Sequence, residues 1–245
     1  NVLTFSPALA KALRIPTLTA PLALSLLCFI LASALLWTLL RPDPLLLARD
    51  LSEDGVGATV SGSVWAGFAM IKASPQALTG VITMAIGHAV MVGLMVMTPL
   101  HMNHGGASLE VIGLVISLHI LGMYGASPLI GMAVDRVGAK AVGLIGIATQ
   151  VLAGGLAAST HQGQSWALTA SLILLGLGWA ATFISGSTML VAAISVVHRP
   201  AAQGSADLVM GLAAAGAGAL AGVVVQFWGF GQLGLLAGAL CVVSA

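Results

Sequence analysis

Long apolar runs, separated by short polar or glycine-rich stretches, make up most of this 245-residue chain. A helix needs about 20 consecutive apolar residues to cross the hydrocarbon core of a membrane, and several runs reach that length. Polar and apolar residues do not alternate within the runs, as they would in the strands of a membrane barrel. Helices also satisfy their backbone polar groups internally, which lipid requires. The pattern therefore predicts an all-α membrane protein built as a multi-span transmembrane helix bundle.

Six complete spans and a truncated seventh are predicted from the apolar runs and the signals that bound them. The second span opens at Ser74 and Pro75, a capping residue followed by proline at the first helical position. The third opens at Ser108. The predicted spans cover residues 18–40, 75–99, 108–131, 141–158, 166–191, 205–228 and 234–245.

The basic residues orient these spans. Six of the eight Lys and Arg residues lie in connections on one side of the array: Arg41, Arg49, Lys72, Arg136, Lys140 and Arg199. The positive-inside rule places that side in the cytoplasm. Residues 41–74 then form a long cytoplasmic loop, with an interfacial helix expected around 63–71. Residues 1–17 form a non-cytoplasmic lead-in, although they hold the two exceptions, Lys11 and Arg14.

Composition narrows the class of protein further. Charged residues are 6% of the chain and hydrophobic residues 59%, too little polar surface for a soluble fold of this length. The net charge is +1 and the basic residues are scattered along the chain, so no nucleic-acid partner is expected. Cys28 and Cys241 lie in apolar runs and are interpreted as packing residues. His101 and His104 have ligand-like spacing but sit beside a glycine-rich loop, and neither a metal nor a cofactor is expected.

One connection carries a specific motif. Between the third and fourth spans, residues 131–140 read Gly-Met-Ala-Val-Asp-Arg-Val-Gly-Ala-Lys. The first glycine allows another helix to approach, the arginine offers a fork for a carboxylate, and the second glycine permits a tight turn. The alternative interpretation is a simple positive-inside turn. The motif residues are Gly131, Asp135, Arg136, Gly138 and Lys140.

This segment resembles the cytoplasmic loop motif of the major facilitator superfamily, with Ala139 where the family usually has a second basic residue. The resemblance implies the C-terminal half of such a transporter, spans six to twelve, with the central loop at 41–74 and pseudo-repeated helices. Because the chain starts at Asn1 and stops inside an apolar run, we expect a fragment whose N-terminal half is missing. The implied location is the cell membrane, as in a bacterial inner membrane.

Polar residues inside membrane spans are costly, so each is a candidate for the solute or proton pathway. His88 sits near the middle of the second span, which corresponds to a cavity-lining helix of the family. Trp179 and Thr182 share a face of the fifth span, which corresponds to another. His119 in the third span and Gln150 in the fourth are further candidates. For each, packing between helices is the alternative.

Asp207 lies about one turn into the predicted sixth span, on a stripe of small residues. It is a candidate cytoplasmic gate residue that pairs with a basic group of the missing half. The alternative is that its carboxylate complements the dipole at the start of its own helix.

The predicted function is secondary active transport of a small solute by alternating access, with a coupled proton as one option. The partners are the lipid bilayer, the solute and the missing half. A permease or channel subunit without ion coupling is the second hypothesis. An intramembrane enzyme is the third, but it would need clustered carboxylates or histidines, which the spans do not supply.

Overall fold

The computed structural model describes residues 20–41, 43, 47, 63–160 and 165–243. The chain divides into two units, residues 1–59 and residues 60–245, and each is described by itself. The predicted lead-in at 1–17 and most of the predicted loop at 41–74 lie outside the described residues. By length and composition, six of the described helices could cross a membrane.

The first unit contains helix α2, Ala20–Leu39, in the place of the predicted span at 18–40. The guanidinium carbon of Arg41 lies 4.7 Å from the centroid of the Trp37 ring. Tryptophan and arginine are typical anchors at a membrane interface, so this end of α2 suits the edge of a bilayer.

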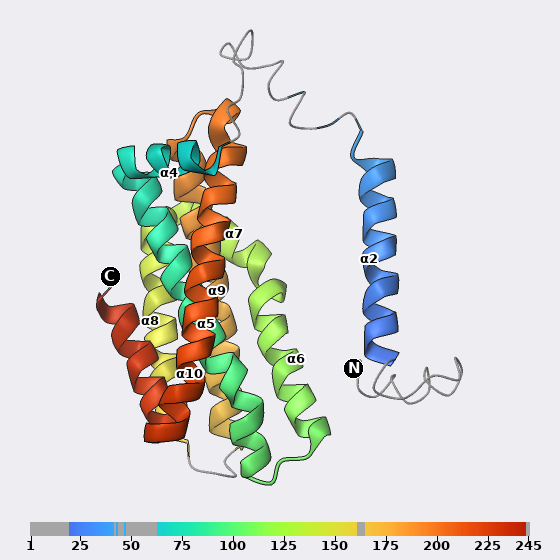
Figure 1. The fold of residues 1–245 in the computed structure, drawn as a ribbon, viewed down its shortest axis with the longest axis vertical. Helices are drawn as coiled ribbons and strands as arrows, with labels where there is room; N and C mark the ends of the chain where they lie inside the picture. The colour runs from blue at the N-terminus through green and yellow to red at the C-terminus, as the bar shows by residue number, and fades with distance from the viewer. Residues whose placement is uncertain (1–19, 42, 44–46, 48–62, 161–164, 244–245) are drawn as a thin grey trace. The chain divides into compact units, whose positions relative to one another are not determined.

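The second unit is a bundle of helices (Figure 1). The short helix α4, Val64–Ala73, lies where an interfacial helix was expected. Ser74 caps the next helix by accepting a hydrogen bond from the Ala77 amide at 3.3 Å, and Ser108 does the same for Val111 at 3.4 Å. The long elements are α5 (Pro75–His104), α6 (Leu109–Gly125), α7 (Ser127–Val137), α8 (Ala139–Ala158), α9 (Ser165–Ala193) and α10 (Arg199–Val243), with a 3₁₀ turn η2 (Val196–His198) before α10.

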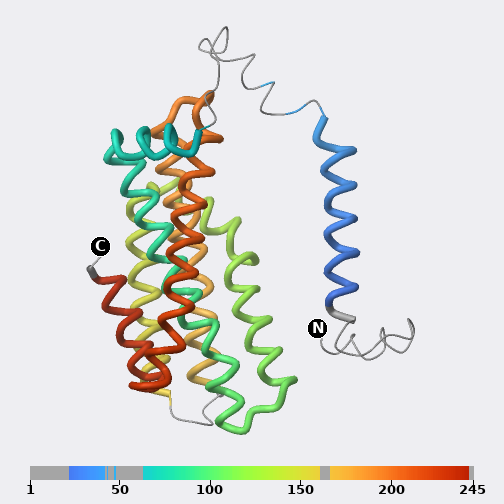
Figure 2. Tube along the Cα trace, viewed as in Figure 1, coloured from blue at the N-terminus to red at the C-terminus, as the bar shows by residue number. Residues whose placement is uncertain are grey.

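Two predicted boundaries differ from the structure. The span predicted at 108–131 is divided at Ala126 into α6 and α7, because Pro128 favours the start of a new helix. The spans predicted at 205–228 and 234–245 correspond to the two parts of α10, which starts earlier at Arg199. Gly229 within it has φ of 84°, and the chain reverses direction there (Figure 2). We treat α10 as two legs, residues 199–228 and 230–243.

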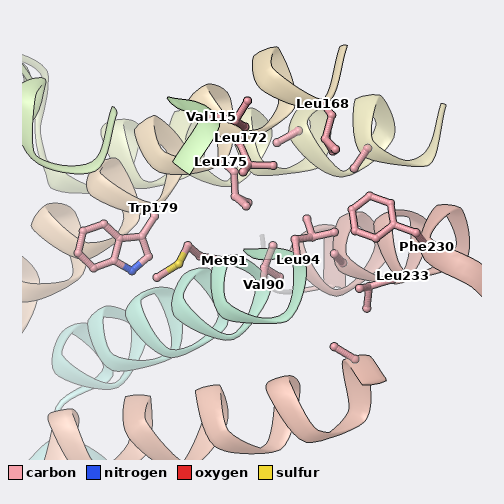
Figure 3. Packing of buried hydrophobic residues seen from close by; sticks show 14 of the residues in the cluster. Val90, Met91, Leu94, Val115, Leu168, Leu172, Leu175, Trp179, Phe230 and Leu233 are labelled. Atoms are coloured by element: carbon pink, nitrogen blue, oxygen red, sulfur yellow. The ribbon is translucent and has the colours of Figure 1, made fainter. Parts of the chain in front are cut away.

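Helix α9 packs against α5, α6, α7 and α8, and the first leg of α10 lies against α4 and α5. The larger core cluster includes Leu94, Leu172, Leu175 and Phe230 (Figure 3). Because lipid is as apolar as these side chains, close packing rather than burial from water holds such helices together. Helices α5 and α6 both pack against α9, so side chains of the three helices can meet in one place.

Candidate functional site

His88 of α5 and Trp179 of α9 form a direct contact between the two helices. The Trp179 indole N–H donates a hydrogen bond to His88 Nδ1 at 2.9 Å, and the ring centroids lie 6.0 Å apart. Trp179 is buried, whereas His88 is half-buried. The structure therefore brings together two residues that the sequence placed 91 positions apart as separate candidates.

Two further rings surround Trp179. Phe183, one turn further along α9, stacks on it at 5.1 Å with an interplanar angle of 12°. Tyr124 of α6 meets it edge-on, at 5.9 Å and 71°. Figure 3 shows Trp179 near Met91 at one end of the core cluster. We call His88, Tyr124, Trp179 and Phe183 the aromatic cluster.

Tyr124 was not among the predicted pathway residues. In the structure Tyr124 is 62% exposed, whereas His119 on the same helix is fully buried. Its approach to Trp179 depends on how α6 lies against α9, which spacing along one helix does not reveal. The aromatic cluster thus draws on three helices and offers one largely exposed ring.

His119 lies in the interface between α6 and α9. Its Nδ1–H donates to the Leu172 carbonyl oxygen at 2.7 Å, while Nε2 is buried and makes no hydrogen bond among the described residues. At Gly176, an added Cβ would lie 2.5 Å from the His119 backbone oxygen. His119 therefore lies between packed helices in this structure, and its place on a solute pathway stays a prediction.

Gln150 and Thr182 are also buried between helices rather than on an open face. The Gln150 side-chain amide donates to the Gly87 carbonyl oxygen of α5 at 2.9 Å, and its own oxygen lies 3.6 Å from Cys241 Sγ. Thr182 donates to the Trp179 carbonyl oxygen at 3.0 Å. The Gln150 bond joins α8 to α5, whereas the Thr182 bond lies within α9. A place for either residue on the solute pathway stays a prediction.

The motif residues run from α7 through the turn at Gly138 into the start of α8. Gly138 has φ of 91° and ψ of 149°, a conformation that only glycine adopts readily. Asp135, Arg136 and Lys140 are exposed beside it. Gly131 lies inside α7, and a Cβ added there would have no atom of the described residues within 4 Å, so a close helix approach at Gly131 is not made within this unit.

Asp207 is exposed and accepts a hydrogen bond from the Gln203 amide at 3.0 Å. Because α10 begins at Arg199, Asp207 lies about two turns into the helix, and the first turn holds no acidic residue. The prediction that it lies one turn from the helix start was wrong. The helix dipole acts mainly within the first turn, so that alternative role loses its basis.

Arg199 has a structural role that sequence reasoning missed. Its Nε–H lies 3.1 Å from the carbonyl oxygens of both Val191 and Ile194, at the end of α9. The last carbonyl groups of a helix lack partners within it, and a cation there also suits the dipole. Arg199 therefore caps α9 as well as starting α10.

A cavity of about 500 Å³ lies at the opposite end of the bundle, between α5 and the Gly229 turn. His101, His104 and Gln226 line it, and the His101 ring stacks on Phe230 at 4.2 Å. Among the described residues, no three His, Cys, Asp or Glu side chains are grouped to hold a metal ion.

The comparisons with known proteins agree with the fold. The sequence pattern of the Major Facilitator Superfamily matches residues 80–245. The MFS-type transporter YdeG of Bacillus subtilis is 35% identical over 94% of this chain and 54% of its own length. YddS of the same organism is 34% identical, over 88% of this chain and 50% of its own length.

A more distant relative is the riboflavin transporter RfnT of Brucella anthropi, which is 28% identical over 57% of this chain and 35% of its own length. No solved structure matches this chain significantly. The chain spans about half the length of the Bacillus relatives. From the helix bundle, the loop motif and these matches, the chain belongs to the Major Facilitator Superfamily.

Proposed function

We propose that this chain lines one side of a solute pathway in a secondary active carrier of the cell membrane, which works by alternating access. The observation that carries the proposal is the aromatic cluster, where a half-buried His88 and a largely exposed Tyr124, from two helices, both contact Trp179 of a third. Polar and aromatic groups that converge between helices are typical of small-molecule sites. Family membership and the relatives' names support transport as the activity.

We further propose that a second half completes the pathway, because the Bacillus relatives are about twice as long as the matched region. In an alternating-access carrier the solute binds near the midplane between two halves. The exposed ring of Tyr124 then faces solute or the second half rather than lipid.

The experiment is solute counterflow in proteoliposomes that contain the complete carrier. Riboflavin is the first solute to test, since a relative is named for it. We expect internal unlabelled solute to accelerate uptake of labelled solute, because a carrier exchanges solutes through one site. Uptake without such acceleration would favour the channel or permease-subunit alternative, and no uptake across a broad solute panel would contradict transport.

Proton coupling is tested in the same vesicles with an imposed pH gradient. Histidine is the side chain whose charge changes near neutral pH, and His88 is the histidine of the aromatic cluster. We expect an inward proton gradient to raise uptake and a protonophore to abolish that rise. Uptake that does not depend on the pH gradient would indicate a carrier without proton coupling.

A further inference from the structure

The hydrogen bond between Trp179 and His88 determines which nitrogen of His88 carries its proton. An indole N–H can only donate, so His88 Nδ1, at 2.9 Å, must be the acceptor. A neutral imidazole has one donor and one acceptor nitrogen. Nε2 of His88 therefore carries the proton, and Trp179 is a positioning residue that holds the ring in this tautomer.

The second nitrogen of His88 is available to a ligand. Among the described residues, His88 makes no hydrogen bond besides the one from Trp179. The His88 side chain is half-buried, and no described residue bonds its Nε2–H. A polar group left without a partner at membrane depth is costly until a ligand or water bonds it.

The rings that contact Trp179, the partner of His88, indicate the shape of that ligand. Phe183 already stacks on Trp179, which is only 7% exposed, so Trp179 offers little free surface. Tyr124 is 62% exposed, the largest free ring surface in the cluster, so a ligand can stack on it. A flat ligand gains most from such contact, because aromatic rings prefer offset-stacked or edge-on arrangements.

From these contacts we infer that the site takes a planar heteroaromatic solute whose ring nitrogen or carbonyl oxygen accepts a hydrogen bond from His88 Nε2–H. This inference rests on the proposed function, since it names the solute class of the same site. An aromatic cage for a cationic ligand is disfavoured, because the free His88 N–H presents its positive end to the ligand.

Two variants separate the roles of the two nitrogens. In His88→Gln the amide nitrogen replaces Nε2 as a donor, but the acceptor for Trp179 is lost. In His88→Asn the amide oxygen replaces Nδ1 as the acceptor, but the donor to the ligand is lost. The pair therefore tests whether His88 serves the ligand or only holds Trp179.

The binding test uses the complete carrier in nanodiscs with quinoline, which has a ring nitrogen, and naphthalene, which has the same shape without one. Empty nanodiscs correct for partition into lipid. We expect saturable quinoline binding that is retained in His88→Gln and weakened about fivefold in His88→Asn, the loss expected for one hydrogen bond. The inference would be overturned if naphthalene bound as tightly as quinoline, or if quinoline did not bind. It would also be overturned if His88→Gln weakened quinoline binding while His88→Asn did not.

The tautomer is measured directly by ¹⁵N NMR of the histidine-labelled complete carrier, with the His88 signals assigned by their loss in His88→Gln. We expect the Nε2–H tautomer in the wild type and a mixture of tautomers in Trp179→Phe, which lacks the indole donor. A purely structural Trp179 would leave the tautomer unchanged, and that result would overturn its positioning role. These readouts need no transport, so absent counterflow with intact quinoline binding would contradict the proposed function alone.

Discussion

Histidines occupy different environments within this bundle, and the environment determines what each side chain can bind. His88 is half-buried and keeps one nitrogen available, whereas His119 is fully buried with its donor committed to Leu172. Both are predicted by position alone to be pathway residues. We therefore propose a solute contact for His88 and a packing role for His119.

For His119 we expect His119→Leu to lower stability without changing solute affinity. The change removes the bond to Leu172, and such inter-helix bonds contribute about 0.6–1 kcal/mol in membrane proteins. Thermal melting in detergent and quinoline binding measure the two effects. Weakened binding with unchanged melting would return His119 to the solute pathway.

For Asp207 we expect Asp207→Asn to change conformational balance rather than stability. The carboxylate is exposed two turns into α10, where it can pair with a basic residue of a second half. A surface pair worth ~1 kcal/mol shifts a two-state population roughly fivefold. Distances between spin labels on the cytoplasmic side of the complete carrier report the inward-open fraction. An unchanged distribution would remove the gate role.

Among the helices, glycine sets how closely the second leg of α10 approaches α8. An added Cβ at Gly154 would lie 2.6 Å from the Gly234 backbone oxygen, and one at Gly234 would lie 2.6 Å from that of Gly154. Gly155, the next residue, has open space at its Cβ position. Neighbouring glycines of one helix therefore differ completely in what they contact.

We expect Gly154→Ala to destabilise the bundle by about 1–3 kcal/mol, because backbone atoms cannot yield to the new methyl group as a flexible side chain could. Gly155→Ala is the matched control, with no loss expected. Reversible unfolding in mixed detergent measures both. Equal stability of the two variants would mean that α8 and α10 are not packed this closely.

At the scale of the whole protein, the loop motif is a proposed contact with a second half. A side chain at Gly131 would meet no atom within 4 Å in the described part of the chain. We therefore expect Gly131→Leu to leave melting unchanged while lowering the transport rate of the complete carrier at least tenfold. Normal transport in this variant would reduce the motif to a simple turn.

The orientation across the membrane is a second whole-molecule prediction. Lys72, the α7–α8 turn and Arg199 lie at one end of the bundle by the alternating direction of the helices, and the α5–α6 connection lies at the other. In a background without Cys28 and Cys241, we expect Asn103→Cys to react with an impermeant thiol reagent on whole cells and Ala139→Cys to react only after lysis. The opposite labelling would invert the topology.

Much of the secondary structure follows from local signals. Ser74 and Pro75 start a helix through their own capping chemistry, and the apolar runs define membrane spans by length. The turn at Gly138 and the motif around it can also be predicted from the sequence. These features depend on neighbours along the chain, so residue order alone predicts them.

The division of α6 from α7 and the early start of α10 were harder to predict from the sequence, although Pro128 and Pro200 provided signals for them. The aromatic cluster was decided only by the tertiary structure. Which ring meets His88, and whether Tyr124 or His119 faces open space, depends on the rotation and tilt of α6 and α9 against α5. Those angles follow from glycine-mediated packing between distant segments, and no spacing within a single helix encodes them.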